Sequence, residues 1–127
     1  MIYTSYFAKL NKLPNDIIPI SICAKSPSWY DGLEYKKLAP SYDILMQYKS
    51  NPNEELYIKR FKEEILNKRL ATQTVLDLLT LAGNYKGLNY SPEICLLCYE
   101  KPTDFCHRHL VADWLIKNGY SCEEIKL

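Results

Sequence analysis

The sequence has no long hydrophobic run and no excess of charge of either sign. No apolar stretch reaches the roughly 20 residues that a transmembrane helix needs. The segment from Met1 to Phe7 has no basic region followed by an apolar stretch, which argues against a signal peptide. A formal net charge of +1 gives no electrostatic basis for a nucleic-acid partner. We therefore expect a cytoplasmic protein that binds neither membranes nor nucleic acids.

Disulfide bonds also have little support in the sequence. Five cysteines are an odd number, and no secretory signal directs the chain to an oxidising compartment. The sequence has no internal repeat and no low-complexity tract. We expect reduced thiols at every cysteine: Cys23, Cys95, Cys98, Cys106 and Cys122.

The length and composition are those of one globular domain. A chain of 127 residues falls in the range of about 100–200 residues that is typical of one domain. Its 47% hydrophobic and 24% charged residues are ordinary values. We expect a single domain over residues 1–127. A two-fold dimer is compatible with so small a protein, and nothing in the sequence requires it.

Strand and helix signals alternate along the chain. Proline cannot donate a ladder hydrogen bond, so the second strand is placed after Pro19. The run at 94–99 is almost wholly apolar, as in a strand buried on both faces. The pattern predicts an α/β fold, a small Rossmann-like three-layer domain with a mainly parallel central sheet. The expected strands are 2–8, 20–24, 94–99 and 122–126; the expected helices are 42–49, one capped by Asn51 with an apolar stripe to Ile65, 72–82 stopped by Gly83, and one from Thr103 or Asp104 to Asn118.

The turn after the strand at 94–99 is the strongest candidate site. Open α/β sheets bind ligands at the carboxyl edge of their strands. The following helix begins near Phe105, and its first amides carry a partial positive charge that favours anions. Arg108 would add a bidentate clamp on phosphate or carboxylate. We therefore expect an anionic ligand at residues 100–108.

Other walls of this pocket are predicted from two segments. The loop at 25–40 carries Trp29 and Tyr30, whose rings would stack on a planar ligand or, alternatively, only pin the loop to the core. Ser5 and Tyr6 end the first strand, so they approach the same crevice if that strand is central.

Catalysis is the second hypothesis for the same turn. The helix terminus, with His107 and Arg108 beside it, would lower the pKa of the Cys106 thiol and favour a nucleophilic thiolate. Glu100 and His107 are candidate proton carriers. Neighbouring residues on a helix point about 100° apart, so Cys106 and His107 are not a simple contact pair. The alternative is that Cys106 is a packing residue and His107 lies on the helix surface.

A zinc site is a weaker hypothesis. Cys95 and Cys98 lie three residues apart on the predicted strand, so their side chains face opposite sides of the sheet. A zinc site would need a tight turn between them, and the intervening Leu96-Leu97 has no glycine to favour one. We expect no metal and no cofactor. The zinc-type side chains in the region are Cys95, Cys98, Cys106, His107 and His109.

Two segments make the chain similar to a known family. The sequence LLCYE at 96–100, followed by FCHRHLV at 105–111, resembles the C-terminal signature of the domain of unknown function 488 family. Weaker similarity extends to 4–7, 20–22 and 38–41, so it covers most of the chain. The chain resembles the short form found in bacteria and their viruses. The resemblance implies four site residues, namely Glu100, Cys106, His107 and Arg108.

The resemblance does not itself imply a reaction. Many members have a glycine-histidine pair after the first strand, where this chain has Ser5 and Tyr6. The leading hypothesis is a pocket for a small phosphate-bearing, nucleotide-like ligand, which would capture a host nucleotide signal if the chain is viral and acts in the bacterial cytoplasm. The alternative is a hydrolase or a glycosyl or phosphoryl transferase using Cys106 or Glu100. Whether the protein is an enzyme stays open at this point.

Overall fold

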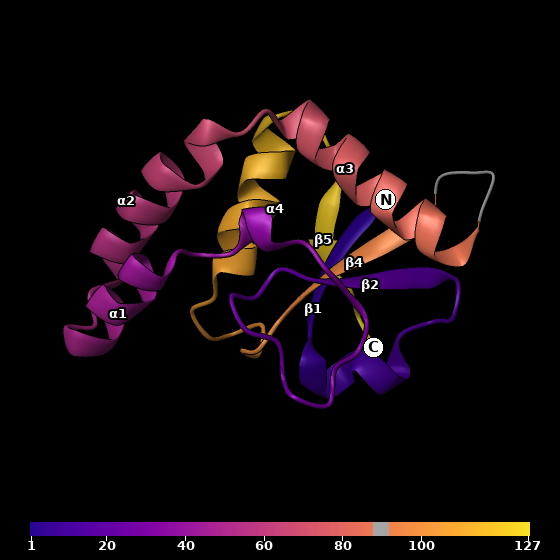
Figure 1. Ribbon diagram of the computed structural model, residues 1–127, viewed down its shortest axis with the longest axis horizontal. Coiled ribbons are helices and arrows are strands. Elements are labelled where there is room, and N and C mark those ends of the chain that lie inside the picture. The colour runs from indigo at the N-terminus through magenta and orange to yellow at the C-terminus, as the bar shows by residue number, and fades with distance from the viewer. Residues whose placement is uncertain (88–91) are drawn as a thin grey trace.

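Within residues 1–87 and 92–127, five parallel strands form one central sheet (Figure 1). The computed structural model describes residues 1–87 and 92–127. The strand order is β3-β2-β4-β1-β5, so β1 lies between β4 and β5. All pairs are parallel, and the carboxyl ends therefore meet at one edge. The strands are β1 (Ile2–Tyr6), β2 (Ile17–Ser21), β3 (Leu33–Glu34), β4 (Glu93–Cys98) and β5 (Cys122–Glu124).

Four α-helices in the described residues accompany the sheet. In Figure 1, α1 and α2 form a lobe at the left, whereas α3 and α4 lie over the sheet. None of these helices is long and apolar enough to cross a bilayer. The helices are α1 (Tyr42–Ser50), α2 (Glu54–Glu64), α3 (Ala71–Lys86) and α4 (His107–Lys117), with short 3-10 turns η1 (Phe7–Lys12), η2 (Lys36–Leu38) and η3 (Leu66–Lys68).

The two faces of the sheet are covered differently. On β4, Ile94 and Leu96 belong to a core cluster that includes residues of all four α-helices. Cys95 and Leu97 alternate with these residues and therefore point to the other face, where they belong to a second cluster. That second cluster contains Phe7 of η1 and residues of the loop after β2. The predicted α/β fold with three layers is confirmed, with the third layer built from η1 and loops.

The second strand begins three residues earlier than predicted. Pro19 lies inside β2 and pairs in register with Cys95 of β4. On the other side, β3 reaches only Ile20 and Ser21 of β2. The ladder at Pro19 is therefore open on one side, where a missing N–H costs no hydrogen bond. The edge strand β3 itself lies in the segment 25–40, which was predicted to be a loop.

The start of α2 and the end of α3 also differ from the prediction. The side chain of Asn53, not of Asn51, caps α2 by accepting from the Leu56 amide at 3.1 Å. Helix α3 continues past Gly83 and ends at Gly87, whose φ of +63° suits glycine. In both cases the residue type was predicted but not the position: Asn53 follows Asn51 by two residues, and Gly87 follows Gly83 by four. The sequence alone does not show which of the two residues lies at the helix boundary.

Candidate functional site

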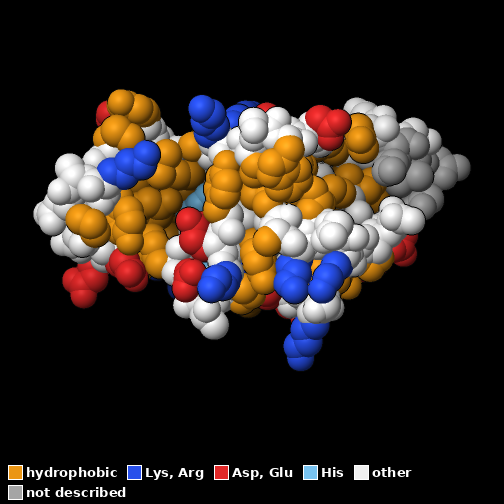
Figure 2. All heavy atoms as spheres, turned by 90° about the horizontal axis from the view of Figure 1, so that it is seen from below, with side chains coloured by type: hydrophobic (Ala, Val, Ile, Leu, Met, Phe, Trp, Pro, Cys, Tyr) orange, Lys and Arg blue, Asp and Glu red, His pale blue; other side chains and the backbone are white. Residues whose placement is uncertain are grey.

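A cleft of about 1130 Å³ opens at the carboxyl edge of the sheet. Figure 2 shows it as a hollow beside the α1–α2 lobe, with hydrophobic side chains on its walls and a histidine in its depth. Its position agrees with the edge expected from the sequence. The lining comes from the exit of β2 (Cys23, Ala24, Lys25), from Pro40, from α1 and α2 (Leu45, Tyr48, Lys49, Glu54, Tyr57) and from the β4–α4 connection (Cys98, Tyr99, Glu100, Pro102, Thr103, Asp104, Phe105, Cys106, His107, with His109).

One wall of the cleft is aromatic. Tyr48 of α1 stacks on Phe105, with ring centroids 5.7 Å apart. Tyr57 of α2 meets Phe105 edge-on at 5.0 Å. Tyr57 is buried, whereas Tyr48 and Phe105 keep part of their surface exposed. The wall therefore offers aromatic surface that is already held in place.

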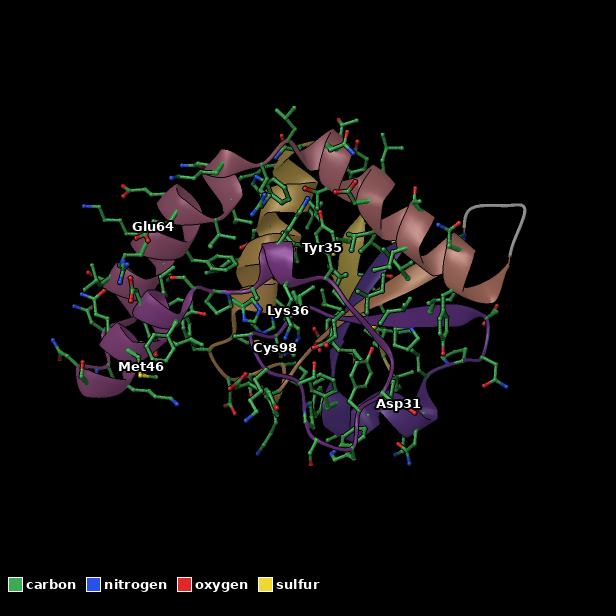
Figure 3. The ribbon with its side chains drawn as sticks, in the orientation of Figure 1. Asp31, Tyr35, Lys36, Met46, Glu64 and Cys98 are labelled. Carbon is green, nitrogen blue, oxygen red and sulfur yellow. A yellow bond between two sulfur atoms is a disulfide. The ribbon has the colours of Figure 1, made fainter. Side chains whose placement is uncertain are left out.

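The floor of the cleft contains two cysteines and a histidine. Cys98 ends β4 and Cys106 is the N-cap of α4, so the helix starts later than the predicted Thr103 or Asp104. The two sulfurs form a disulfide, and the Cα atoms lie 7.2 Å apart. The prediction that every cysteine is reduced is therefore wrong for this pair. Figure 3 labels Cys98, which lies where the β4–α4 connection begins.

The imidazole of His107 is buried against this pair. Its Nδ1 lies 3.4 Å from Cys98 Sγ, and its Nε2 lies 2.7 Å from the carbonyl oxygen of Ile22. Because a carbonyl only accepts, Nε2 carries the proton and Nδ1 presents a lone pair to the sulfur. Burial is the main cause that lowers the pKa of His107 to about 4; the hydrogen bond to the Ile22 carbonyl opposes this shift, and the charges of Arg108 and His109 add to it. His107 is thus a neutral acceptor, and it is not on the helix surface.

Arg108 does not line the cleft. Its guanidinium is fully buried and makes a bidentate pair with Glu124 of β5, both contacts at 3.0 Å. The remaining Nη1 donates to the carbonyl oxygen of Glu100 at 2.7 Å. The side chain also lies over the ring of Tyr6, 5.7 Å from its centroid. The expected clamp on a ligand does not fit this placement, because these partners already occupy the guanidinium; Arg108 anchors the turn.

The other predicted ligand-binding residues lie outside the cleft lining. Tyr6 packs under Arg108, and Ser5 is buried within β1. Trp29 is 61% exposed and meets Phe7 edge-on at 6.0 Å. Tyr30 donates to the carbonyl oxygen of Leu33 at 2.6 Å. Of the segment 25–40, only Lys25 and Pro40 at its two ends reach the cleft.

Glu100 lies at the mouth of the cleft and is exposed. Its Oε2 is 3.7 Å from Cys98 Sγ, so the sequence placed it correctly beside the cysteine turn. Lys25 and Lys49 bring positive charge to the same mouth, whereas Glu54 and Asp104 add negative charge. The mouth is therefore mixed in sign.

Sequence reasoning missed Cys98 and the α1–α2 wall. From the sequence, Cys98 was a candidate site residue only as a possible zinc ligand, whereas in the structure its partner is Cys106, across the turn. The available signal for the wall was the count of 11 tyrosines, but such a count does not distinguish a pocket wall from a core. Cys23 also lines the cleft, but burial raises the pKa of its thiol to about 12, which keeps it protonated.

Comparison with known proteins gives one family. A family model described as "DUF488-N3a: Active DUF488-N3 subclade" matches residues 14–119. The matched range spans β2 to α4 and includes the turn from Cys98 to His107. No curated protein and no solved structure matched the chain.

Proposed function

The chain belongs to the DUF488 family, and from its cleft we propose that it binds a small phosphate-bearing, nucleotide-like ligand. The observation that carries the proposal is the opening of the α4 N-terminus into a cleft with an aromatic wall. At about 1130 Å³ the cleft has room for a nucleotide, since small-molecule pockets commonly measure about 300–1,000 Å³.

The phosphate end of the ligand is assigned to the start of α4. The first amides of a helix have no partner within the helix. Cys106, the N-cap of α4, and His107 both line the cleft, so the partial positive charge of the helix N-terminus lies at its wall. Lys25 and Lys49 supply mobile positive charge from the facing walls. Backbone amides and lysines thus take the part that the sequence assigned to Arg108.

The base end of the ligand is assigned to the aromatic wall. Tyr48 and Phe105 are fixed against each other and against Tyr57. Stacking on such rings tolerates any base, because every base has a π face. His109 also lines the cleft, and its buried Nε2 has no hydrogen-bond partner within residues 1–87 and 92–127. A polar group of the ligand would satisfy it.

A thermal-shift screen tests this function directly. The set comprises nucleotides, cyclic dinucleotides and ADP-ribose derivatives. A ligand at a hundred times its dissociation constant stabilises the fold by about 2.7 kcal/mol, which is readily detected. A screen without a shift for any anionic ligand would contradict the proposal.

A second function is favoured by one contact, that between Cys98 Sγ and His107 Nδ1. In the reduced chain the histidine would accept the thiol proton and leave a nucleophilic thiolate, with Glu100 as a second proton carrier. The alternative is then an enzyme, a hydrolase or a glycosyl or phosphoryl transferase, in which Cys98 joins Cys106 as a candidate nucleophile.

Product analysis separates the two functions. A ligand recovered intact after heat denaturation supports simple binding, and capture of a host signal would be one use of it in a viral protein. An altered ligand supports an enzyme, and Cys98→Ser and Cys106→Ser then show which sulfur reacts. The cytoplasmic location, the viral or bacterial origin and a dimer stay predictions.

A further inference from the structure

We propose that, in the reduced chain, Cys98, Cys106 and His107 bind a divalent metal ion of the zinc class, with the fourth coordination position open to the cleft. The two sulfur atoms and one imidazole nitrogen all lie within 4.8 Å of one another. All three side chains are buried, with exposed fractions of 2%, 4% and 6%. They come from both ends of the β4–α4 connection, so one ion would tie the strand to the helix.

The orientation of His107 points to a ligand. Its Nε2–H is held by the Ile22 carbonyl, and its Nδ1 lone pair is aimed at Cys98 Sγ. Histidines that bind metals are commonly oriented in this way by a backbone carbonyl on the other nitrogen. In the disulfide, Cys98 has no S–H to donate, so this buried acceptor would lack a proton from its neighbour. A metal ion would satisfy the lone pair. A thiol S–H would satisfy it less strongly, because it is a weak hydrogen-bond donor.

The donor set selects the kind of metal. Thiolate and imidazole ligands suit zinc and similar borderline-soft ions, whereas magnesium and calcium require oxygen. Two thiolates and a neutral imidazole around a divalent cation form a site with no net charge, which limits the cost of burying it. Three protein ligands with an open position are the arrangement of catalytic zinc sites. The open position faces the cleft where we place the nucleotide-like ligand.

The spacing of the two cysteines allows a shared ion. Their Cα atoms are 7.2 Å apart, beyond the separation of about 4.4–6.8 Å that is usual for disulfides. The site differs from the zinc hypothesis drawn from the sequence, because Cys95 is not among its ligands. Glu100 lies beside it, with Oε2 3.7 Å from Cys98 Sγ, and is placed to contact a water molecule on the ion.

Metal binding requires that the disulfide first be reduced. A phosphine reductant does this by becoming a phosphine oxide with the oxygen of water, while the two sulfurs gain two electrons and two protons. When the ion binds, the two thiols release their protons to solvent. The proposal does not depend on nucleotide binding, because the ion is titrated without any nucleotide.

Cobalt titration of the full chain tests the proposal. The protein is reduced, freed of metal by a chelator, separated from both reagents under nitrogen and titrated with Co²⁺. We expect one equivalent to produce the absorption bands of tetrahedral thiolate-bound cobalt, and Zn²⁺ to displace it. Cys98→Ser and Cys106→Ser should lose the thiolate bands. Loss of a residue that only orients a metal ligand weakens metal binding about 10–100-fold. His107→Gln removes a ligand itself, so it should weaken Co²⁺ binding by more than about tenfold.

The control variant is Cys122→Ser, since Cys122 is also a buried cysteine but is outside the cluster. It should bind Co²⁺ like the wild type. Thiol counting under denaturing conditions provides a readout that does not require each variant to fold. The metal-bound protein should show five thiols after chelation, and a protein that keeps its disulfide only three. Failure of reduced wild type to bind Co²⁺ or Zn²⁺, or equal binding by Cys98→Ser, would overturn the proposal.

Discussion

Two aromatic regions flank the sheet, and only one of them lines a cleft. In the loop after β2, Trp29 and Tyr30 both pack against Phe7. Further along, Tyr35, labelled in Figure 3, donates to Asp77 of α3 at 2.7 Å. The hydroxyls of Tyr30 and Tyr35 thus have partners within the protein. Tyr30 packs against the cluster on one face of the sheet, and Tyr35 packs against the cluster on the other.

The rings on the α1–α2 side are arranged otherwise. Tyr48 and Phe105 pack against each other on the wall of the cleft, which the two cysteines and His107 also line. Aromatic content alone therefore does not identify a binding surface. The difference lies in what contacts the outer face of each ring, and that depends on segments far apart in the sequence.

The largest effect on stability is expected for Arg108, which anchors the turn beside the cleft by its pair with Glu124. Removing one partner of a buried pair costs about 3–5 kcal/mol, and the partly exposed Glu124 favours the lower end. We expect Arg108→Ala to lower the free energy of unfolding by about 3 kcal/mol, measured by urea denaturation. Arg60→Ala, which removes an exposed pair with Glu64, is the control and should have a much smaller effect. An Arg108 variant that keeps its stability but loses ligand binding would instead support the prediction from the sequence that Arg108 contacts the ligand.

Acid should destabilise the cleft floor through His107. The folded pKa of about 4 lies below the value of 6.5 for the free side chain. Between these values the unfolded chain binds a proton that the folded chain does not, so stability falls as the pH falls from about 6.5 to 4. The total loss is about 3 kcal/mol, present in full below both pKa values.

Urea denaturation at several pH values, with a chelator present, measures this loss. The carboxylates of the protein also titrate in part of this range, so the wild type is compared with His107→Gln. The variant should show a shallower decline on acidification. Parallel curves for the two proteins would show that His107 is not held neutral by burial.

The smallest effect is expected on ligand affinity, which should differ between substitutions in the two aromatic regions. Stacking on one ring is worth about 1–3 kcal/mol per base, so Tyr48→Ala should weaken the nucleotide-like ligand about tenfold. Trp29→Ala should leave the affinity unchanged, because Trp29 lies outside the cleft. Tyr42→Ala controls for changes in α1, since Tyr42 is 73% exposed. Calorimetric titration gives the constants, and loss of affinity in Trp29→Ala would reverse the assignment of the regions.

Local patterns were sufficient to predict where the cleft lies. The apolar run at 94–99 predicted a buried central strand, and parallel strands bring their carboxyl ends together. These two steps place Glu100, Cys106 and His107 at one edge, and the structure has them there.

The roles of individual side chains depended on distant partners. Arg108 is buried because β5 pairs with β1, which brings Glu124 level with Thr4 and within reach of the guanidinium. No local signal connects Arg108 with a short strand that follows α4. Likewise, the Cys98–Cys106 pair depends on how the connection between β4 and α4 folds back. Periodicity describes one element at a time, whereas these contacts join several.

The strand order also has a consequence for how the chain folds. β1 is flanked by β4 and β5, so Ile2 lies level with Ile94 on one side and with Cys122 on the other. During synthesis, β1 therefore stays without either neighbour until β4 and then β5 have left the ribosome. Pairings between such distant segments slow folding and leave strand edges exposed meanwhile. We expect the sheet to be completed only after β4 and β5 have emerged, and the chain to benefit from chaperones in that interval.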